Sequence, residues 1–248
     1  MSLYQRKLGK KPAKIDHRTL KLANYKLDNL TVPNTCDYTN MVTNLGTMLN
    51  DEIGDCTIAA IGHLIQLWTA QNGSQSIIPN SDILSLYEKV TGYNPNEPNT
   101  DNGAVEIDVL NYWRSNPIDN NQLYAYVSIN PKDIEEIKQA IYYFNGAYIG
   151  VELPLSVQDE PEWKFQNLEG NNAPGSWGGH AIPLVAYDDS TFTCITWGAF
   201  LKMDYNFLTN YCEEAYALLS PDIINNKSGK TIEGFNLVQL QTDLGLIS

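Results

Sequence analysis

The sequence predicts an α+β protein in which a helical half precedes a sheet half. Residues 55–146 contain segments with apolar side chains at helical spacing behind capping residues. Residues 147–198 instead hold short β-branched or aromatic runs separated by turn-forming residues, which is typical of strands. Helices first and strands later in one chain favour an α+β fold, and a cleft between two such halves is a common place for a ligand site.

The strongest helical pattern lies in residues 55–73. Asp55 is a suitable N-cap, apolar side chains recur at helical spacing from Ile58 to Trp68, and Gly73 ends the pattern. Further helices are expected over residues 81–93, 104–116, 130–146 and 204–219, with a short amphipathic helix at about 234–245. Strands are expected over residues 124–129, 147–153, 180–187 and 191–198.

Length and composition indicate a globular protein. The chain has 248 residues, of which 43% are hydrophobic and 18% charged, so it can bury a substantial core. It has no apolar run near the roughly 20 residues of a membrane-spanning helix. Its basic start lacks the apolar stretch of a signal peptide, so we expect a cytoplasmic protein or one secreted without a cleaved leader.

The charge is distributed unevenly along the chain. Residues 1–30 carry a net charge of +6 and the remainder −19, within a total of −13. An acidic body disfavours nucleic acid and anionic membranes as partners. We therefore expect residues 1–35 to form a basic, extended N-terminal arm that lies on its own body or on a neighbouring subunit, held mostly by exposed ion pairs.

The remaining residues, 36–248, are predicted to form one domain. Its helical half is expected over about 36–130 and its sheet half over about 131–220, followed by the short C-terminal helix. The four cysteines show neither a CxxC pair nor a Cys/His cluster with metal-ligand spacing. No structural metal and no cofactor is therefore expected.

Cys56 is a candidate nucleophile because it opens the long helix directly after its predicted cap. Backbone N–H groups and the dipole at a helix N-terminus favour the thiolate, which is the reactive form of cysteine. A small buried cysteine in a first helical turn would give the same pattern. The position alone leaves these two interpretations about equal.

The candidate base is found by elimination among three histidines. His63 lies on the same predicted helix, roughly 10 Å along it from Cys56 at about 1.5 Å per residue, and is interpreted as a core residue. His17 lies in the basic arm and is interpreted as a surface residue. His180 follows Gly178 and Gly179 at the start of a predicted strand, where a side chain can project into a cleft.

Four segments resemble papain-type cysteine peptidases, and they follow one another along the chain in the order found in that family. LNDEIGDCTIAA resembles the segment that begins the central helix with the nucleophile, and GGHAIPLVAYDD resembles the strand that bears the histidine. TGYNPNEPNTDNGAVEIDVLNYWR resembles the stretch that lines the substrate cleft, and NPKDIEEIKQAIYYFNGAYIGVELP resembles the helix leading into the sheet half. The resemblance runs from about residue 36 to residue 198. Within this family, the sequence resembles a divergent bacterial or phage branch.

The resemblance implies a papain-like fold with a cleft between its two halves and assigns roles to individual residues. Cys56 would be the nucleophile, His180 the base, Asn50 an oxyanion-hole donor and Thr196 the group that orients the histidine. The substrate contacts would be Asn102, Gly103, Gly179 and Trp197.

Three departures from the family pattern bear on activity. Ile53 replaces the family's disulfide-bonded cysteine, and Asn50 replaces its glutamine. Ile195 occupies the position of the orienting asparagine and cannot hydrogen-bond an imidazole, which leaves Thr196 for that role. The leading hypothesis is a cysteine hydrolase, most simply a peptidase acting on a peptide or protein through an acyl-enzyme, although the same residues could serve an amidase or an acyl transferase. The alternative is a papain-fold binding or structural module with little or no turnover, as part of a larger assembly. A third interpretation treats residues 1–35 as an inhibitory or docking segment that crosses the cleft.

Overall fold

The computed structural model describes residues 6–25, 31–225, 230–231, 238, 240 and 242–243. Most of the C-terminal helix expected at about 234–245 lies outside the described residues, although the four described positions there are helical. Within the described ranges, no helix combines the length and apolar character needed to cross a bilayer.

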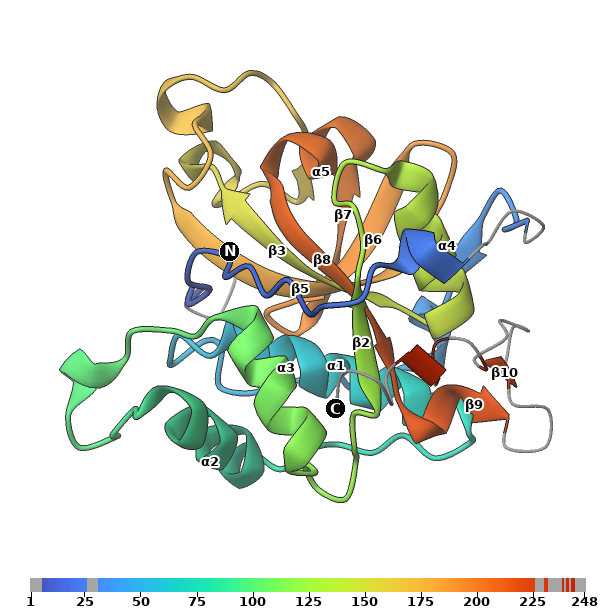
Figure 1. Cartoon of the computed structure of the whole chain (residues 1–248). Helices are drawn as coiled ribbons and strands as arrows, with labels where there is room; N and C mark the ends of the chain where they lie inside the picture. The colour runs from blue at the N-terminus through green and yellow to red at the C-terminus, as the bar shows by residue number, and fades with distance from the viewer. Residues whose placement is uncertain are drawn as a thin grey trace.

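The helices follow the predicted apolar patterns closely. They are α1 (Cys56–Gln71), α2 (Asn80–Thr91), α3 (Glu106–Ser115), α4 (Ile134–Phe144) and α5 (Tyr205–Tyr211). Helix α1 is apolar on all sides and is buried from Cys56 to Trp68. A helix that is hydrophobic all round has to lie inside the molecule, and α1 accordingly packs against the sheet and against α2 and α3 (Figure 1).

Most of the strands belong to one sheet. They are β1 (Cys36–Asp37), β2 (Ala125–Ser128), β3 (Ala147–Leu153), β4 (Glu162–Trp163), β5 (Gly178–Tyr187), β6 (Thr191–Thr196), β7 (Ala199–Asp204) and β8 (Cys212–Leu219). Their order is β2-β8-β3-β5-β6-β7-β4, with β1 paired to β5. All pairings in this sheet are antiparallel except β4 with β7. A separate pair is formed by β9 (Ile224–Asn225) and β10 (Lys230–Thr231). The chain is therefore an α+β protein, as predicted.

One predicted element is wrong in its second half. Residues 204–219 were expected to be a single helix, but α5 ends at Tyr211 and β8 begins at Cys212. Only the first part of the segment has a helix start, at which the Asp204 carboxylate accepts a hydrogen bond from the backbone N–H of Phe207. Strand β8 then lies between β2 and β3 in the middle of the sheet, and that position overrides the helical propensity of its Glu and Ala residues.

The described part of the N-terminal arm crosses the molecule between the helical and sheet halves (Figure 1). Its backbone forms isolated bridges with Ala104 just before α3 and with Ser128 of β2. Leu22, at the far end of this crossing, is fully buried in the core. The arm thus contacts elements from both halves of its own chain.

Candidate active site

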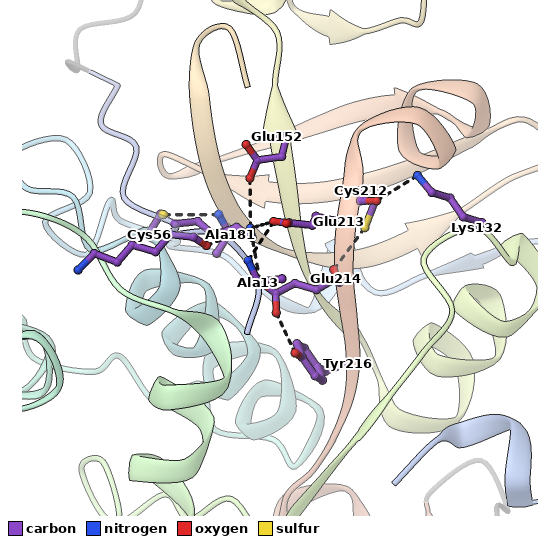
Figure 2. A network of polar contacts seen from close by, with 11 residues as sticks. Ala13, Cys56, Lys132, Glu152, Ala181, Cys212, Glu213, Glu214 and Tyr216 are labelled. Atoms are coloured by element: carbon purple, nitrogen blue, oxygen red, sulfur yellow. Dashed lines mark hydrogen bonds and ion pairs between the residues drawn. The ribbon is translucent and has the colours of Figure 1, made fainter. Parts of the chain in front are cut away.

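Cys56 lies at the first position of α1, directly beneath strand β5. Its thiol is 1% exposed, and its Sγ accepts a hydrogen bond of 3.4 Å from the backbone N–H of Ala181. Helix α1 begins where predicted, but the carboxylate of Asp55 does not cap it. The cysteine is therefore fixed between the start of the buried helix and the sheet (Figure 2).

His180 lies on β5, next to the residue whose N–H contacts the thiol. Its Nε2 is 2.8 Å from Thr196 Oγ1, and its ring stacks on Trp197 with centroids 4.3 Å apart and planes 9° from parallel. Its Nδ1 is buried and has no hydrogen-bond partner among the described residues. The ring is thus held on one nitrogen and one face, while its second nitrogen makes no hydrogen bond to the described residues.

Cys56, His180, Thr196 and Asn50 all border one small cavity, although they come from four different parts of the sequence. The volume of this cavity is about 10 Å³, at the lower limit for a single water molecule. Ile195 also borders it. The structure therefore brings the four predicted catalytic residues together, in a space that is closed to a substrate.

His63 also borders this cavity, which the sequence did not indicate. Its Nδ1 is 3.0 Å from Gln66 Oε1, one turn further along α1, and burial lowers the pKa of its imidazole to about 4. It is buried, as expected of a core histidine, and a neutral ring is the form that this environment favours.

Burial keeps both Cys56 and His180 uncharged. It raises the pKa of the Cys56 thiol to about 12, although the Ala181 N–H opposes this rise by stabilising the thiolate. Burial also lowers the pKa of His180 to about 3, and the positive charge of Arg6 acts in the same direction. In this closed arrangement the pair is a neutral thiol and a neutral imidazole, not a thiolate and an imidazolium.

The loop before Cys56 contains two further buried polar side chains, Asn50 and Asp55. Asn50 is 2% exposed and donates from its side chain to the backbone oxygen of Ile53 at 3.3 Å. Asp55 is fully buried, and its carboxylate oxygens have no partner of normal hydrogen-bond geometry among the described residues. Burial raises the pKa of Asp55 well above its ordinary value, although the nearby Asn50 amide opposes this. The amide of Asn50 is therefore engaged locally in the closed state.

The N-terminal arm closes the site with its main chain. The backbone N–H groups of Gly9 and Lys10 donate to Gly179 O at 3.3 and 3.1 Å, and Gly9 O accepts from Ala104 N at 2.8 Å. A backbone group of Gly9 also lies close enough to the Cys56 thiol to lower its pKa slightly. A stretch of extended peptide thus lies across the nucleophile between the two walls of the site.

Glycines permit this close approach of two backbones. A Cβ atom added to Gly9 would lie 1.7 Å from Gly54 O, one on Gly103 2.0 Å from Gly9 O, and one on Gly179 2.3 Å from Lys10 O. Real side chains do not tolerate such distances. The arm can therefore lie this close to the walls only because glycine, which has no Cβ, stands at each of these three contacts.

Of the four predicted substrate contacts, three lie against the arm and one does not. Gly103 and Gly179 lie against the arm, and Trp197 Nε1 donates to Lys7 O at 3.0 Å while the Arg6 guanidinium lies 5.2 Å from the Trp197 ring centre. Asn102 is exposed, and its side chain donates to the backbone oxygen of Asn99 within its own loop. Asn102 therefore does not reach the arm in this structure.

The expectation that exposed ion pairs would hold the arm is wrong for residues 6–11. Backbone hydrogen bonds and one fully buried lysine, Lys10, hold this part, and only further along does an exposed pair occur, between Lys14 and Asp108 at 2.8 Å. Lys10 was missed because a lysine in a basic run carries no sequence signal of burial. Glu106, by contrast, interrupts the apolar face of its helix, and that signal was available.

All four cysteines are buried, and none of them forms a disulfide. The described residues contain no group of three or more His, Cys, Asp or Glu side chains suited to a metal ion.

Comparison with known proteins identifies the fold. Xylellain, a cysteine protease from Xylella fastidiosa, superposes with a TM-score of 0.69 at 17% identity, over 88% of this chain and 98% of that one. A digestive procathepsin L of Tenebrio molitor gives 0.59 at 11% identity, over 83% and 75% of the two chains. A cysteine protease of Carica candamarcensis gives 0.55 at 11% identity, over 75% and 98%. No family model and no curated protein sequence matches. The chain has a papain-like fold.

Proposed function

We propose that this protein is a cysteine hydrolase that cleaves peptide bonds through an acyl-enzyme on Cys56. The observation that carries the proposal is the geometry of His180, whose Nε2 is held by Thr196 and whose Nδ1 is buried without a hydrogen-bond partner among the described residues, while His180 and Cys56 border the same cavity. A histidine with one nitrogen anchored and the other free beside a thiol is the arrangement that nucleophilic catalysis requires. The papain-like fold, which the compared cysteine proteases share, supports the same chemistry.

The proposed reaction has two halves. His180 Nδ1 takes the Cys56 proton, the thiolate attacks the substrate carbonyl carbon, and the C–N bond breaks as the imidazolium returns its proton to the leaving amine. Water then loses a proton to Nδ1 and attacks the thioester, the C–S bond breaks, and the proton returns to the sulfur. Atoms and charges balance without any cofactor.

Neighbouring groups support each half. For Nδ1 to accept a proton, Nε2 must carry the hydrogen and donate it to Thr196 Oγ1, which as a hydroxyl oxygen can accept this hydrogen bond. Trp197 covers one face of the ring and shields that hydrogen bond from water. In the open site the Asn50 amide and the backbone N–H of Cys56 would stabilise the oxyanion. Ile195 supplies no hydrogen bond to the histidine, so Thr196 carries that role alone.

The arm has to leave before a substrate can enter. It occupies the position over Cys56, and burial by the arm and body keeps the catalytic pair neutral. Moving it would return water to the site and bring both pKa values back towards their ordinary range, where a thiolate and an imidazolium can form. We therefore propose that the described state is a latent form of the enzyme.

The second candidate function is a papain-fold binding or structural module with little turnover. The closed cavity of about 10 Å³ and the isoleucine at position 195 favour it. In that case the arm would be a permanent part of the structure, and Cys56 would be an ordinary buried thiol.

Alkylation of Cys56 separates the two functions. In the variant Gly9→Ala, the added Cβ would lie 1.7 Å from Gly54 O, which is too close for a real side chain. The substitution should therefore expel the arm, and it changes no residue of the body. We expect iodoacetamide to alkylate Cys56 of this variant at least tenfold faster than Cys56 of the unaltered chain at neutral pH. The matched control is Lys11→Ala, whose side chain is exposed.

A second measurement compares the alkylation rate of Cys56 with that of a simple thiol in solution. In the Gly9→Ala background, His180→Ala should lower the alkylation rate if the imidazole activates the sulfur, and peptide cleavage should disappear in Cys56→Ser. A Cys56 that becomes accessible but reacts no faster than a simple thiol, with no peptide cleaved, would establish the binding module instead.

A further inference from the structure

A buried acidic pocket lies beside the thiol, and Lys10 fills it. The Lys10 side chain is 0% exposed. Its Nζ lies 3.2 Å from Glu152 Oε1 and 3.4 Å from Glu214 Oε1, and it also bonds Glu213 Oε2 and Lys11 O. Glu106 is a further acidic neighbour that raises the pKa of the Lys10 ammonium. One cation is thus surrounded by four carboxyl groups, three of which are drawn in Figure 2.

The pocket is adjacent to the catalytic pair. Its floor is Gly150 of β3, where an added Cβ would lie 2.1 Å from Lys10 Cε and 2.9 Å from Glu106 Oε1. Gly150 pairs with Ala181 of β5, whose N–H contacts Cys56 Sγ, and the next position on β3, Val151, pairs with His180. The pocket therefore lies one strand away from the nucleophile and one residue along the arm from Gly9.

The pocket remains short of positive charge even with Lys10 in place. Glu106 is fully buried, and both of its carboxylate oxygens lack a hydrogen-bond partner among the described residues. Burial, and then the neighbouring Glu214, raises the pKa of Glu106 well above its ordinary value. Burial also lowers the pKa of Lys10, but the surrounding carboxylates outweigh it and the net shift is upward. Once the arm leaves, these carboxyl groups require either protons or another cation.

We propose that this pocket is a specificity pocket for a lysine or arginine side chain of the peptide substrate, adjacent to the residue that lies at Cys56. This inference rests on the proposed function and names the substrate class. The pocket holds a whole lysine side chain, Gly150 leaves room for the end of its aliphatic stem, and carboxylates surround the ammonium group. An arginine suits it as well, because a guanidinium can bind two carboxylates at once. The arm fills the pocket with a side chain of the same class.

A binding experiment tests the pocket without catalysis. The protein is the full chain carrying Gly9→Ala and Cys56→Ser, and the probe is a fluorescent peptide with the sequence of residues 6–14. Norleucine in place of Lys10 in the peptide should weaken binding at least tenfold, whereas norleucine in place of Lys11 should change it less than threefold. Equal binding of all three peptides would overturn the proposal.

Cleavage tests whether substrates use the pocket. Quenched-fluorescent peptides in which arginine or its neutral analogue citrulline is placed at each position in turn are offered to the Gly9→Ala chain. We expect at least tenfold higher kcat/KM for arginine at one position near the scissile bond. A preference in arm-peptide binding with no preference in cleavage would mean that the pocket only anchors the arm, and would overturn the proposal.

Two substitutions outside the arm test whether the pocket residues cause the preference for arginine. Gly150→Ala blocks the pocket, and Glu214→Gln removes one buried charge while keeping the size of the side chain. Glu214→Gln should lower kcat/KM for the arginine substrate towards that of the citrulline substrate, because it removes charge. Gly150→Ala should lower kcat/KM for both substrates, because citrulline has nearly the size of arginine. If either variant fails to fold, Glu152→Gln, at a partly exposed position, provides the same comparison. An inert Cys56 would instead refute the proposed function, and the binding experiment would still decide the pocket.

Discussion

Two stretches of the same basic arm are held in different ways. Residues 6–11 lie in the cleft, where the main chain forms hydrogen bonds to both walls and Lys10 is buried among glutamates. Residues 13–19 lie on the surface, where Lys14 pairs with Asp108 and Arg18 pairs with Asp16. Both stretches are rich in cations, yet only the first is enclosed by the protein.

The difference shows that sequence charge does not reveal where the attachment is strong. An exposed ion pair contributes about 0–1 kcal/mol and weakens in salt. A buried charge whose partner is removed costs about 3–5 kcal/mol because the remaining charges lose their compensation. The cleft stretch should therefore control whether the arm is closed, and the surface stretch should add little.

The largest effect is expected from removing the buried cation. Lys10→Ala should favour release of the arm by roughly 3 kcal/mol, at the low end of the buried range because Glu152 and Glu213 are partly exposed. That corresponds to about a 100-fold increase in the rate at which iodoacetamide modifies Cys56 through arm opening. Lys11→Ala removes the same charge at the next, exposed position and should change the rate less than threefold. Equal effects of the two variants would mean that net charge, not burial, holds the arm.

Acid should also release the cleft stretch. Burial lowers the pKa of His180 to about 3 from an ordinary 6.5, so the closed form binds fewer protons than an open form in which the ring meets water. The contribution of His180 to the free energy of arm closure is therefore fully present above about pH 6.5 and is lost as the pH falls towards 3. Over that range the closure equilibrium weakens by about 1.4 kcal/mol, or tenfold, per pH unit.

Hydrogen exchange followed by mass spectrometry measures this pH dependence. After correction for intrinsic exchange rates, amides of residues 7–11 should exchange about tenfold faster at pH 5 than at pH 6. Amides of β3 should not change, because the sheet stays folded. An arm that exchanges equally at both pH values would show that His180 keeps its depressed pKa after opening.

The sequence predicted those elements whose side chains repeat a period. Strand β3 occupies the expected residues 147–153, and α1 begins at Cys56. Strand β8 was predicted as helix because Glu213 and Glu214 near its start resemble a solvent-facing helical turn, although both form ion pairs with the buried Lys10. Strand β7 was not predicted, since Lys202 interrupts a short run on its half-exposed edge.

The candidate site was predictable where its residues stand at recognisable positions in the chain. The helix start at Cys56 and the Gly-Gly before His180 are such positions, and Thr196 followed from the neighbouring Trp197-Gly198. The Lys10 pocket was not predictable, because its members come from the arm, α3, β3 and β8 and no local pattern links them. Burial of a charge is a property of the assembled fold.

The smallest effect is expected from salt. Raising the ionic strength from about 0.1 to 1 M shortens the screening length from about 10 to 3 Å. This should weaken the exposed pair of Lys14 and Asp108 but reach the enclosed Lys10 much less. Limited trypsin digestion should then cut severalfold faster after Lys14 and Arg18 at high salt, with cleavage after Lys7 and Lys10 nearly unchanged. An unstructured peptide of residues 6–25 corrects for the effect of salt on trypsin itself. Equal acceleration at all four sites would show that the arm opens as one unit, and the distinction between its two stretches would then be wrong.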